Sequence, residues 1–250
     1  MMPTDLLPFT QPWVYGLMAA LIAISAFLQG VGGVGFTMFA APVALMICPE
    51  LVPGPLLTLG GLVTLMTAIR ERHHIAWSPV SCAVGGRIVG ALIAVLALGR
   101  LAKGPLSLLF AGLILLAVTM SASGLRIVAT KLNSGIAGLV SGIMGTLTSV
   151  GSPPLAITLQ YHTPPTIRAT IGTILAIGAT VSLFFLAAIG HYRWHDFLLS
   201  ATLSPFMFLG FWLSNKARHR VGATALRRGL LIFCVVSSIG LIVKTLWLWK

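Results

Sequence analysis

Long runs of apolar residues alternate with short polar gaps along the whole chain. Ten apolar segments can be distinguished, at residues 12–29, 35–48, 55–69, 77–98, 105–125, 133–148, 152–161, 169–189, 196–215 and 224–248. A helix of about 20 apolar residues matches the hydrocarbon core of a bilayer, and a segment in lipid must satisfy its backbone hydrogen bonds internally. The pattern predicts an all-α, polytopic integral membrane bundle with about eight to ten membrane helices, counting short half-helices.

Two of these segments, 35–48 and 152–161, are too short to cross a bilayer at about 1.5 Å per residue. Each follows a stretch that disfavours regular helix. The first stretch is the glycine run at 30–35, and the second is the sequence Gly-Ser-Pro-Pro at 151–154. Glycine weakens a helix interior and proline breaks it. We therefore expect two half-helices, each joined to the preceding helix by a break.

The two halves of the chain share motifs in the same order at one spacing, 112 residues, as between Gly30 and Gly142. The chain is expected to form one transmembrane domain over 1–250, with one repeat at about 12–128 and the other at about 133–249. Five segments per repeat is an odd number, so the halves should be inverted across the bilayer. Inverted repeats with broken helices are typical of transporters that bind substrate near the midplane. The paired residues are Gln29 with Ser141, Gly30 with Gly142, Gly33 with Gly145, Pro42 with Pro154, and Thr58 with Thr170.

Charge orients this bundle. The net charge is +12, but only 8% of the residues are charged, whereas soluble domains have about 25%. If the short segments form hairpin-like pairs, the gaps at 70–72, 126–131, 168 and 216–228 share one side and carry most of the basic residues. The positive-inside rule places that side in the cytoplasm and both termini outside. We expect a multi-pass protein of the cell (plasma or inner) membrane. Nucleic acid is excluded as a partner, because the basic residues form no single soluble face.

Arg87 lies inside a predicted span, about ten residues into segment 77–98. An arginine at this depth is costly and is a candidate functional residue. Two other interpretations stay open: an arginine that bonds helix carbonyls, or one that reaches the surface along its stem. None of the four acidic residues lies within an apolar run; they are Asp5, Glu50, Glu71 and Asp196. A buried cation without a buried acid favours a small anion as substrate.

The glycine-rich breaks have two interpretations that can hold together. Small residues allow close helix packing, and a broken helix presents free N–H groups whose positive dipole end attracts anions. The polar residues paired by the repeat, Gln29 with Ser141 and Thr58 with Thr170, could line the same path or bond back to their own helices.

Signals for catalysis and metal binding are absent from the sequence. We find no HExxH or GxSxG motif, no carboxylates paired at helical spacing, and no histidine inside a predicted span. We therefore expect no enzyme activity, no catalytic residue, no metal and no cofactor. A non-transporting membrane scaffold subunit is the alternative class of function, although it would not explain the repeated breaks or Arg87.

Four motifs follow one another along the chain. They are Gly30-Val-Gly-Gly-Val-Gly-Phe with Pro42, Gly138-Leu-Val-Ser-Gly142, Gly151-Ser-Pro-Pro154 and Arg168-Ala-Thr170. In this order they resemble the sulfite exporter TauE/SafE family. The resemblance implies a permease with two related halves, associated with sulfite, organosulfonates and other small anions, and it makes Arg168 a candidate anion gate at a helix start. Arg87 lies on no motif assigned to the family.

We expect a transporter of a small anion, most readily sulfite or an organosulfonate. The alternative substrate is a different small anion, of the carboxylate type. The expected partners are this anion and the lipid bilayer, and the sequence is compatible with a homo-oligomer. The candidate residues of the substrate pathway are Gln29, Gly30, Gly33, Thr58, Arg87, Ser141, Gly142, Gly145, Gly151, Pro153, Pro154, Arg168 and Thr170.

Overall fold

The computed structural model describes residues 11–99, 103–123, 127–217 and 232–233. Within them it contains nine α-helices, two short 3-10 turns and no strand, which confirms the all-α prediction. Apart from residues 232–233, the expected tenth segment at 224–248 lies outside the described residues. The helices are α1 (Pro12–Gly32), α2 (Phe36–Ile47), α3 (Gly54–Arg70), α4 (Trp77–Leu98), α5 (Lys103–Ala122), α6 (Lys131–Thr148), α7 (Ser152–Leu159), α8 (Pro164–Ala188) and α9 (Trp194–Ala217).

Four of the described helices, α1, α4, α8 and α9, are long and apolar enough to cross a membrane. Large apolar side chains on their outer surfaces are exposed, as Phe184 and Leu209 show at 69% and 51%. Tryptophans stand exposed where three helices begin, at Trp13, Trp77 and Trp194. Exposed apolar surface between tryptophans near the helix ends is typical of a protein that faces lipid.

Both expected half-helices are present. The backbone leaves α1 at Gly33, which has φ +77°, and α2 begins three residues later. Glycine adopts such a conformation without steric cost. The second break follows α6 at Ser149, with φ 66°, and α7 opens with Pro153 and Pro154 in its first turn. Proline fits there because the first N–H groups of a helix have no partner within it.

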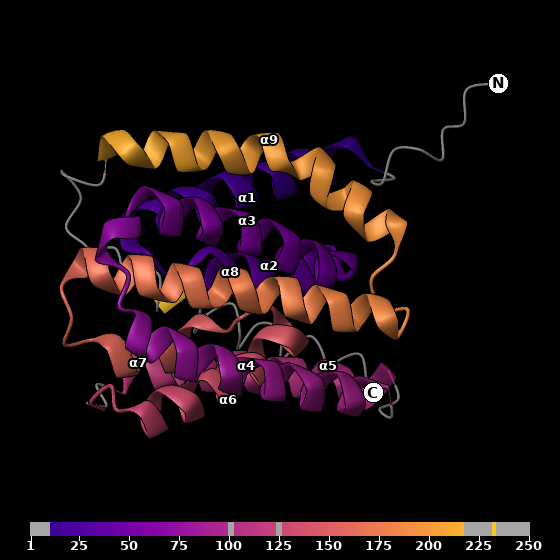
Figure 1. Cartoon of the computed structure of the whole chain (residues 1–250). Helices are drawn as coiled ribbons and strands as arrows, with labels where there is room; N and C mark the ends of the chain where they lie inside the picture. The colour runs from indigo at the N-terminus through magenta and orange to yellow at the C-terminus, as the bar shows by residue number, and fades with distance from the viewer. Residues whose placement is uncertain (1–10, 100–102, 124–126, 218–231, 234–250) are drawn as a thin grey trace.

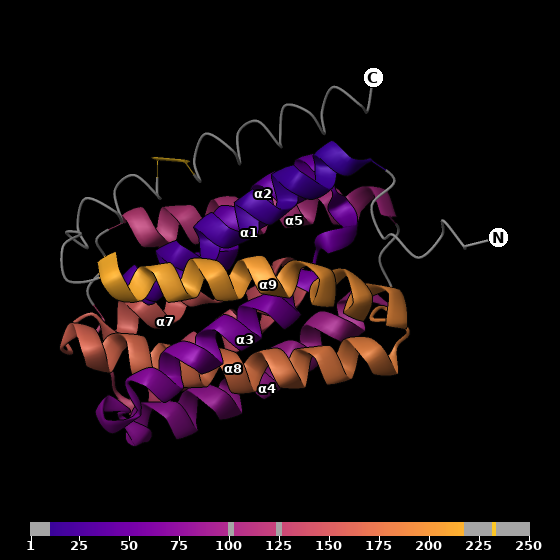
Figure 2. The ribbon, with the colours of Figure 1, turned by 90° about the horizontal axis from the view of Figure 1, so that it is seen from above.

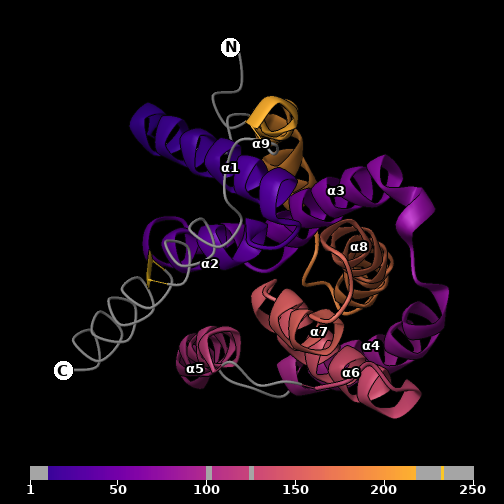
Figure 3. The same ribbon diagram turned by 90° about the vertical axis from the view of Figure 1, so that its left-hand side faces the viewer.

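The helices form three layers (Figure 1). One layer holds α1 and α9, another holds α4 and α6, and α3 and α8 lie between them, with α8 between α3 and α4 (Figures 2 and 3). On the side of the bundle away from α3 and α8, the helices α2 and α5 lie next to each other (Figure 3).

Glycines set the closest helix contacts. A Cβ on Gly138 would overlap the backbone of Ala83, and one on Gly142 would overlap that of Arg87, so α4 and α6 pack backbone to backbone. Both contacts advance in the same direction along the two helices, which therefore run parallel. Such contacts between small residues replace the hydrophobic driving force that helices lack in lipid.

The layer of α1 and α9 is packed in the same way as the layer of α4 and α6. Gly210 packs on Ala23 and Gly30 packs on Ser214, so α1 and α9 also run parallel. The central pair runs antiparallel, because Gly172 meets Ala68 whereas Gly61 meets Ala179. Exchanging the first half for the second maps α4 and α6 onto α9 and α1, and α3 onto α8. The inverted repeat itself remains a prediction that this pattern supports.

The helix directions define two ends of the bundle. We call the end where α1, α3 and α9 finish and α4, α6 and α8 begin the basic end, and the other the opposite end. Among the described residues, the basic end holds most of the lysines and arginines, namely Arg70, Arg72, Lys131, Arg168 and Lys216. The positive-inside rule predicts that the basic end faces the cytoplasm.

Candidate anion site

Arg87 lies deep in the bundle. It is the eleventh of the 22 residues of α4, and 2% of it is exposed. Its Nη1 donates hydrogen bonds to the hydroxyl of Ser141 and, at 3.2 Å, to the Ser141 carbonyl oxygen. The Ser141 hydroxyl in turn donates to the carbonyl oxygen of Gly151 at 2.5 Å. The guanidinium is thereby tied to both α6 and the break before α7.

Three glycines make room for the guanidinium. A Cβ on Gly151 would stand 2.6 Å from Nη1, and one on Gly145 would stand 2.9 Å from Nη2. A Cβ on Gly178 of α8 would overlap Nε and Cδ of Arg87. Any side chain at these positions would push Arg87 out of place, so the three glycines form a cradle that fits an arginine. We call Gly145, Gly151 and Gly178 the glycine cradle.

Arg87 has no counter-charge among the described residues. Its Nε is buried and has no hydrogen-bond partner there, and none of the described carboxylates forms an ion pair with it. A buried charge without a partner is strongly destabilised in an apolar surrounding. The guanidinium therefore favours an anion beside it.

A cavity of about 30 Å³ adjoins Arg87 at the place where the two breaks meet. Its wall is formed by the end of α1, the start of α2, the middle of α3, the turn between α6 and α7, and α8. Such a volume holds about two water molecules. The polar residues that line it are Gln29, Thr37, Thr64, Arg87, Ser149 and Ser152.

Two hydroxyl groups that line the cavity form no hydrogen bond with any described residue. Thr37 lies in the first turn of α2 and Ser152 in the first turn of α7, and neither hydroxyl has a hydrogen-bond partner among the described residues. By contrast, Thr64 donates to the carbonyl oxygen of Gly60 at 2.7 Å, and Ser149 donates to that of Pro53 at 2.9 Å. Thr37 and Ser152 thus remain as donors to a ligand, one from each half-helix.

Gln29 lines the cavity and also holds the first break together. Its Nε2 donates to the carbonyl oxygen of Gly33 at 2.8 Å, and its Oε1 accepts from the N–H of Phe36 at 3.2 Å. One side chain thereby satisfies backbone groups on both sides of the break. The repeat pairs Gln29 with Ser141, and each of them bonds across the break of its own half.

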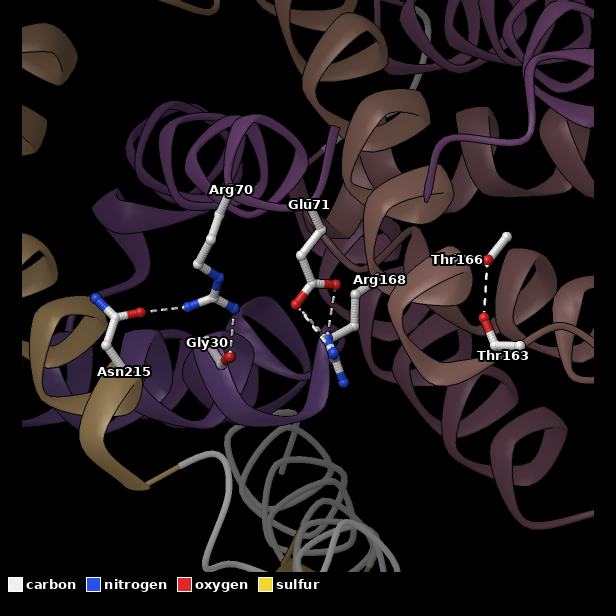
Figure 4. A network of polar contacts seen from close by, with 7 residues as sticks. All are labelled: Gly30, Arg70, Glu71, Thr163, Thr166, Arg168 and Asn215. Carbon is white, nitrogen blue, oxygen red and sulfur yellow. Dashed lines mark hydrogen bonds and ion pairs between the residues drawn. The ribbon is translucent and has the colours of Figure 1, made fainter. Parts of the chain in front are cut away.

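Arg168 lies at the basic end beside Glu71 (Figure 4), and it does not line the cavity. Its Nε lies 3.0 Å from both carboxylate oxygens of Glu71, and its Nη2 lies 2.9 Å from Oε1. Glu71 is only 7% exposed, although it lies in a gap between the predicted spans. A bidentate pair with arginine is what stabilises a carboxylate in such a place. The charge of Arg168 is already balanced by Glu71.

Four further predicted residues fall into two groups. Gly30 and Gly33 pack at the basic end, against Ser214 and the side chain of Arg168, respectively. Thr58 and Thr170 lie near the beginnings of α3 and α8, at opposite ends of the bundle, and bond Tyr192 and Ala76. None of these four residues lines the cavity.

The structure thus brings Gln29, Arg87 and Gly151 to the cavity wall, with Ser141, Gly142 and Gly145 packed around Arg87. Sequence reasoning missed Gly178, Thr37 and Ser152. Gly178 has no counterpart glycine in the first repeat, because the residue 112 positions before it is Met66. The two hydroxyls look like ordinary helix residues until the fold places them beside an unpaired arginine.

Comparison with known proteins identifies the family. A model of the family described as sulfite exporter TauE/SafE matches residues 17–241. A protein of Comamonas testosteroni, described as probable inner membrane transporter protein TsaS, is 26% identical over 211 residues, which cover 76% of this chain and 84% of the relative. No solved structure matches the chain. The chain therefore belongs to the sulfite exporter TauE/SafE family and is a multi-pass membrane transporter of the cell membrane, not an enzyme.

Proposed function

We propose that the protein is a permease for a small oxyanion, sulfite or an organosulfonate first, and that the anion binds in the cavity beside Arg87. One observation carries this proposal: Arg87 is 2% exposed, lines the cavity, and has no carboxylate partner among the described residues. An anion in the cavity would complete the arginine's electrostatic surroundings. Charge-assisted hydrogen bonds of this kind are the strong ones in proteins.

The donors around the cavity suit an anion with several oxygens. Arg87 supplies its guanidinium from one wall, and Thr37 and Ser152 supply hydroxyls from the two half-helices. Both half-helices also begin at the cavity, where their dipoles favour negative charge. A sulfite ion, or the sulfonate group of an organosulfonate, could accept from all three side chains at once.

The cavity volume indicates that transport requires a change of shape. At about 30 Å³ the cavity holds about two waters, which is less than an organosulfonate occupies. In transporters built from inverted repeats, the halves rock around a central site and open it to each side in turn. The two breaks on either side of the cavity are the natural places for such movement.

The comparisons support the coarse part of this proposal. The relative from Comamonas testosteroni is described as an inner membrane transporter, and we place this chain in the inner membrane by analogy. A carboxylate-type anion is the alternative substrate, because the same donors would bind a carboxylate.

Uptake of ³⁵S-labelled sulfite by proteoliposomes of the purified protein tests the proposal, with oxygen excluded so that sulfite is not oxidised. The proposal predicts saturable uptake above that of empty liposomes. Unlabelled methanesulfonate should compete, and acetate at the same concentration should not. Competition by acetate alone would favour the carboxylate alternative. If no sulfite is taken up, methanesulfonate and acetate are tested as labelled substrates in turn. The absence of flux for all three anions, from protein with an intact thermal unfolding transition, would refute the permease proposal.

A further inference from the structure

We propose that the two threonines paired by the repeat, Thr58 and Thr170, belong to two gates that close the cavity from opposite ends of the bundle. The inference rests on the proposed function, because a gate has meaning only for a transported substrate. Neither threonine lines the cavity. Each instead fastens its own helix of the central pair to a turn contributed by the other half of the chain.

The gate at the opposite end joins α3 to the turn between α8 and α9. The Thr58 hydroxyl lies 2.8 Å from the hydroxyl of Tyr192. The Tyr192 ring lies over Gly54, where a Cβ would stand 2.7 Å from a ring carbon. Nearby, Ser149 donates to the carbonyl oxygen of Pro53, which ties the α6–α7 break to the start of α3. These three contacts hold the opposite end together through neutral groups, although the side chain of Asp196 also lies beside Gly54.

The gate at the basic end joins α8 to the turn between α3 and α4. The N–H of Ala76 donates to the Thr170 hydroxyl at 3.1 Å. Two residues before Thr170, Arg168 holds Glu71 at the end of α3 in a bidentate ion pair. Arg70 adds hydrogen bonds to the carbonyl oxygen of Gly30 at 2.6 Å and to Asn215 at 2.7 Å (Figure 4). The end of α1, the end of α3, the start of α8 and the end of α9 are thereby held together.

The two gates correspond under the repeat. Thr58 and Thr170 are 112 residues apart, the spacing that relates the two halves. Their partners, Ala76 and Tyr192, both lie just before the tryptophan that begins the next helix, Trp77 in one half and Trp194 in the other. The same pair of elements therefore meets at both ends with the halves exchanged, although the partner of the threonine is a backbone N–H at the basic end and a tyrosine hydroxyl at the opposite end. Both contacts are present together, so both of the proposed gates are closed in this structure.

The gates differ in strength. The residue 112 positions after Glu71 is Leu183, and the residue 112 positions before Arg168 is Leu56. The opposite end therefore has apolar residues at the positions that correspond to the ion pair of the basic end. Hydrogen bonds between charged groups stabilise more than bonds between neutral hydroxyls. The gate at the opposite end should therefore open more readily, so that the empty transporter exposes its cavity mainly to that side.

Thiol labelling from each side of the membrane tests this inference without any transport substrate. The reporter is Thr64→Cys, whose side chain lines the cavity and is 4% exposed, in a background where Cys48, Cys82 and Cys234 are replaced by alanine. An impermeant methanethiosulfonate reagent is added to right-side-out and to inside-out vesicles. Without further changes, labelling should be faster from the opposite end.

Each gate is then weakened separately. Tyr192→Phe should raise labelling from the opposite end about three- to tenfold, as expected for one neutral hydrogen bond, and should not raise it from the basic end. Glu71→Gln should raise labelling from the basic end about tenfold or more, and Thr170→Val should do so to a smaller extent if Glu71→Gln does not fold. Thr67→Val and Thr173→Val are matched controls, because these threonines bond only their own helices, at Val63 and Ala169.

The outcomes separate the two proposals. Side-selective increases support the gates even if sulfite proves not to be a substrate, because labelling requires no flux. Equal increases from both sides, or no change for any gate variant with an intact unfolding transition, would overturn the gates and leave the anion site at Arg87 untouched.

Discussion

The hydroxyl of Ser141 links Arg87 to the break between α6 and α7. It accepts a hydrogen bond from Nη1 of Arg87 and donates one to the carbonyl oxygen of Gly151 at 2.5 Å. Gly151 is both the residue before α7 and part of the cavity wall. A movement of α7 should therefore also move the guanidinium of Arg87. This links the charge at the proposed anion site to one of the two half-helices that we expect to move.

Ser141→Ala removes that link and leaves the shape of the site unchanged. We expect Arg87 to keep its bond to the Ser141 backbone carbonyl, and the affinity for sulfite to fall about three- to tenfold, since a hydrogen bond to a charged group stabilises by about 1.5–3 kcal/mol and part of it remains. The KM for sulfite uptake measures the effect. Ser81→Ala is the control, because Ser81 is exposed and bonds only Ser78 of its own helix. An unchanged KM would contradict the role given to Ser141.

Gly178→Ala tests the glycine cradle. A methyl group there would overlap Nε and Cδ of Arg87 and displace the side chain. We expect sulfite uptake to fall at least about tenfold, since misplacing a single charge-assisted bond costs about that much. Gly85→Ala is the matched control, because it lies on α4, two residues from Arg87, and nothing stands within 4 Å of its Cβ. Full activity in Gly178→Ala would show that Arg87 is not held as described.

Gly138→Ala tests the packing of α4 on α6. Its methyl group would overlap the backbone of Ala83, which cannot move aside as a flexible side chain can. We expect a loss of about 1–3 kcal/mol in stability, as for other overpacked sites, seen as a lower melting temperature in tryptophan-fluorescence unfolding. Gly85→Ala again serves for comparison and should leave the melting temperature unchanged or slightly raised, because alanine favours helix over glycine.

Exchanging the charges of Arg168 and Glu71 tests whether their ion pair holds the basic end together. Either single change, Arg168→Glu or Glu71→Arg, places two like charges side by side in a partly buried position and should destabilise by about 3–5 kcal/mol. The double variant restores opposite charges and should recover most of the lost melting temperature. If the double variant is no more stable than the singles, the pair does not contribute in the way described.

The hydrophobic pattern predicted the helices well. All nine described helices lie where apolar segments were expected, and the breaks at Gly33 and Ser149 fall beside the predicted glycine-rich stretches. These features are local, because helix length and interruption depend on neighbouring residues. The relation of the halves as inverted repeats stays a prediction.

The details of the site could not be predicted in the same way, because they depend on contacts between distant segments. Arg87 could be recognised from the sequence because an arginine inside a membrane span is energetically unfavourable. Its partners on α6 and α8 could not, because they lie 54 or more residues away. The burial of Glu71 could not be foreseen, because its partner Arg168 lies 97 residues further along the chain. Thr58 and Thr170 were expected along the path, whereas the fold places them at its two ends.

The central claim is that the charge of Arg87 binds the transported anion, and the most direct test is ³⁵S-sulfite uptake by Arg87→Gln and Arg87→Lys beside the unchanged protein, reconstituted at equal density. Arg87→Gln should lose saturable uptake. Arg87→Lys should keep a fraction of it with a raised KM, because an ammonium retains the charge but not the fork that reaches Ser141. Uptake by Arg87→Gln with the KM and maximal rate of the unchanged protein would contradict the account.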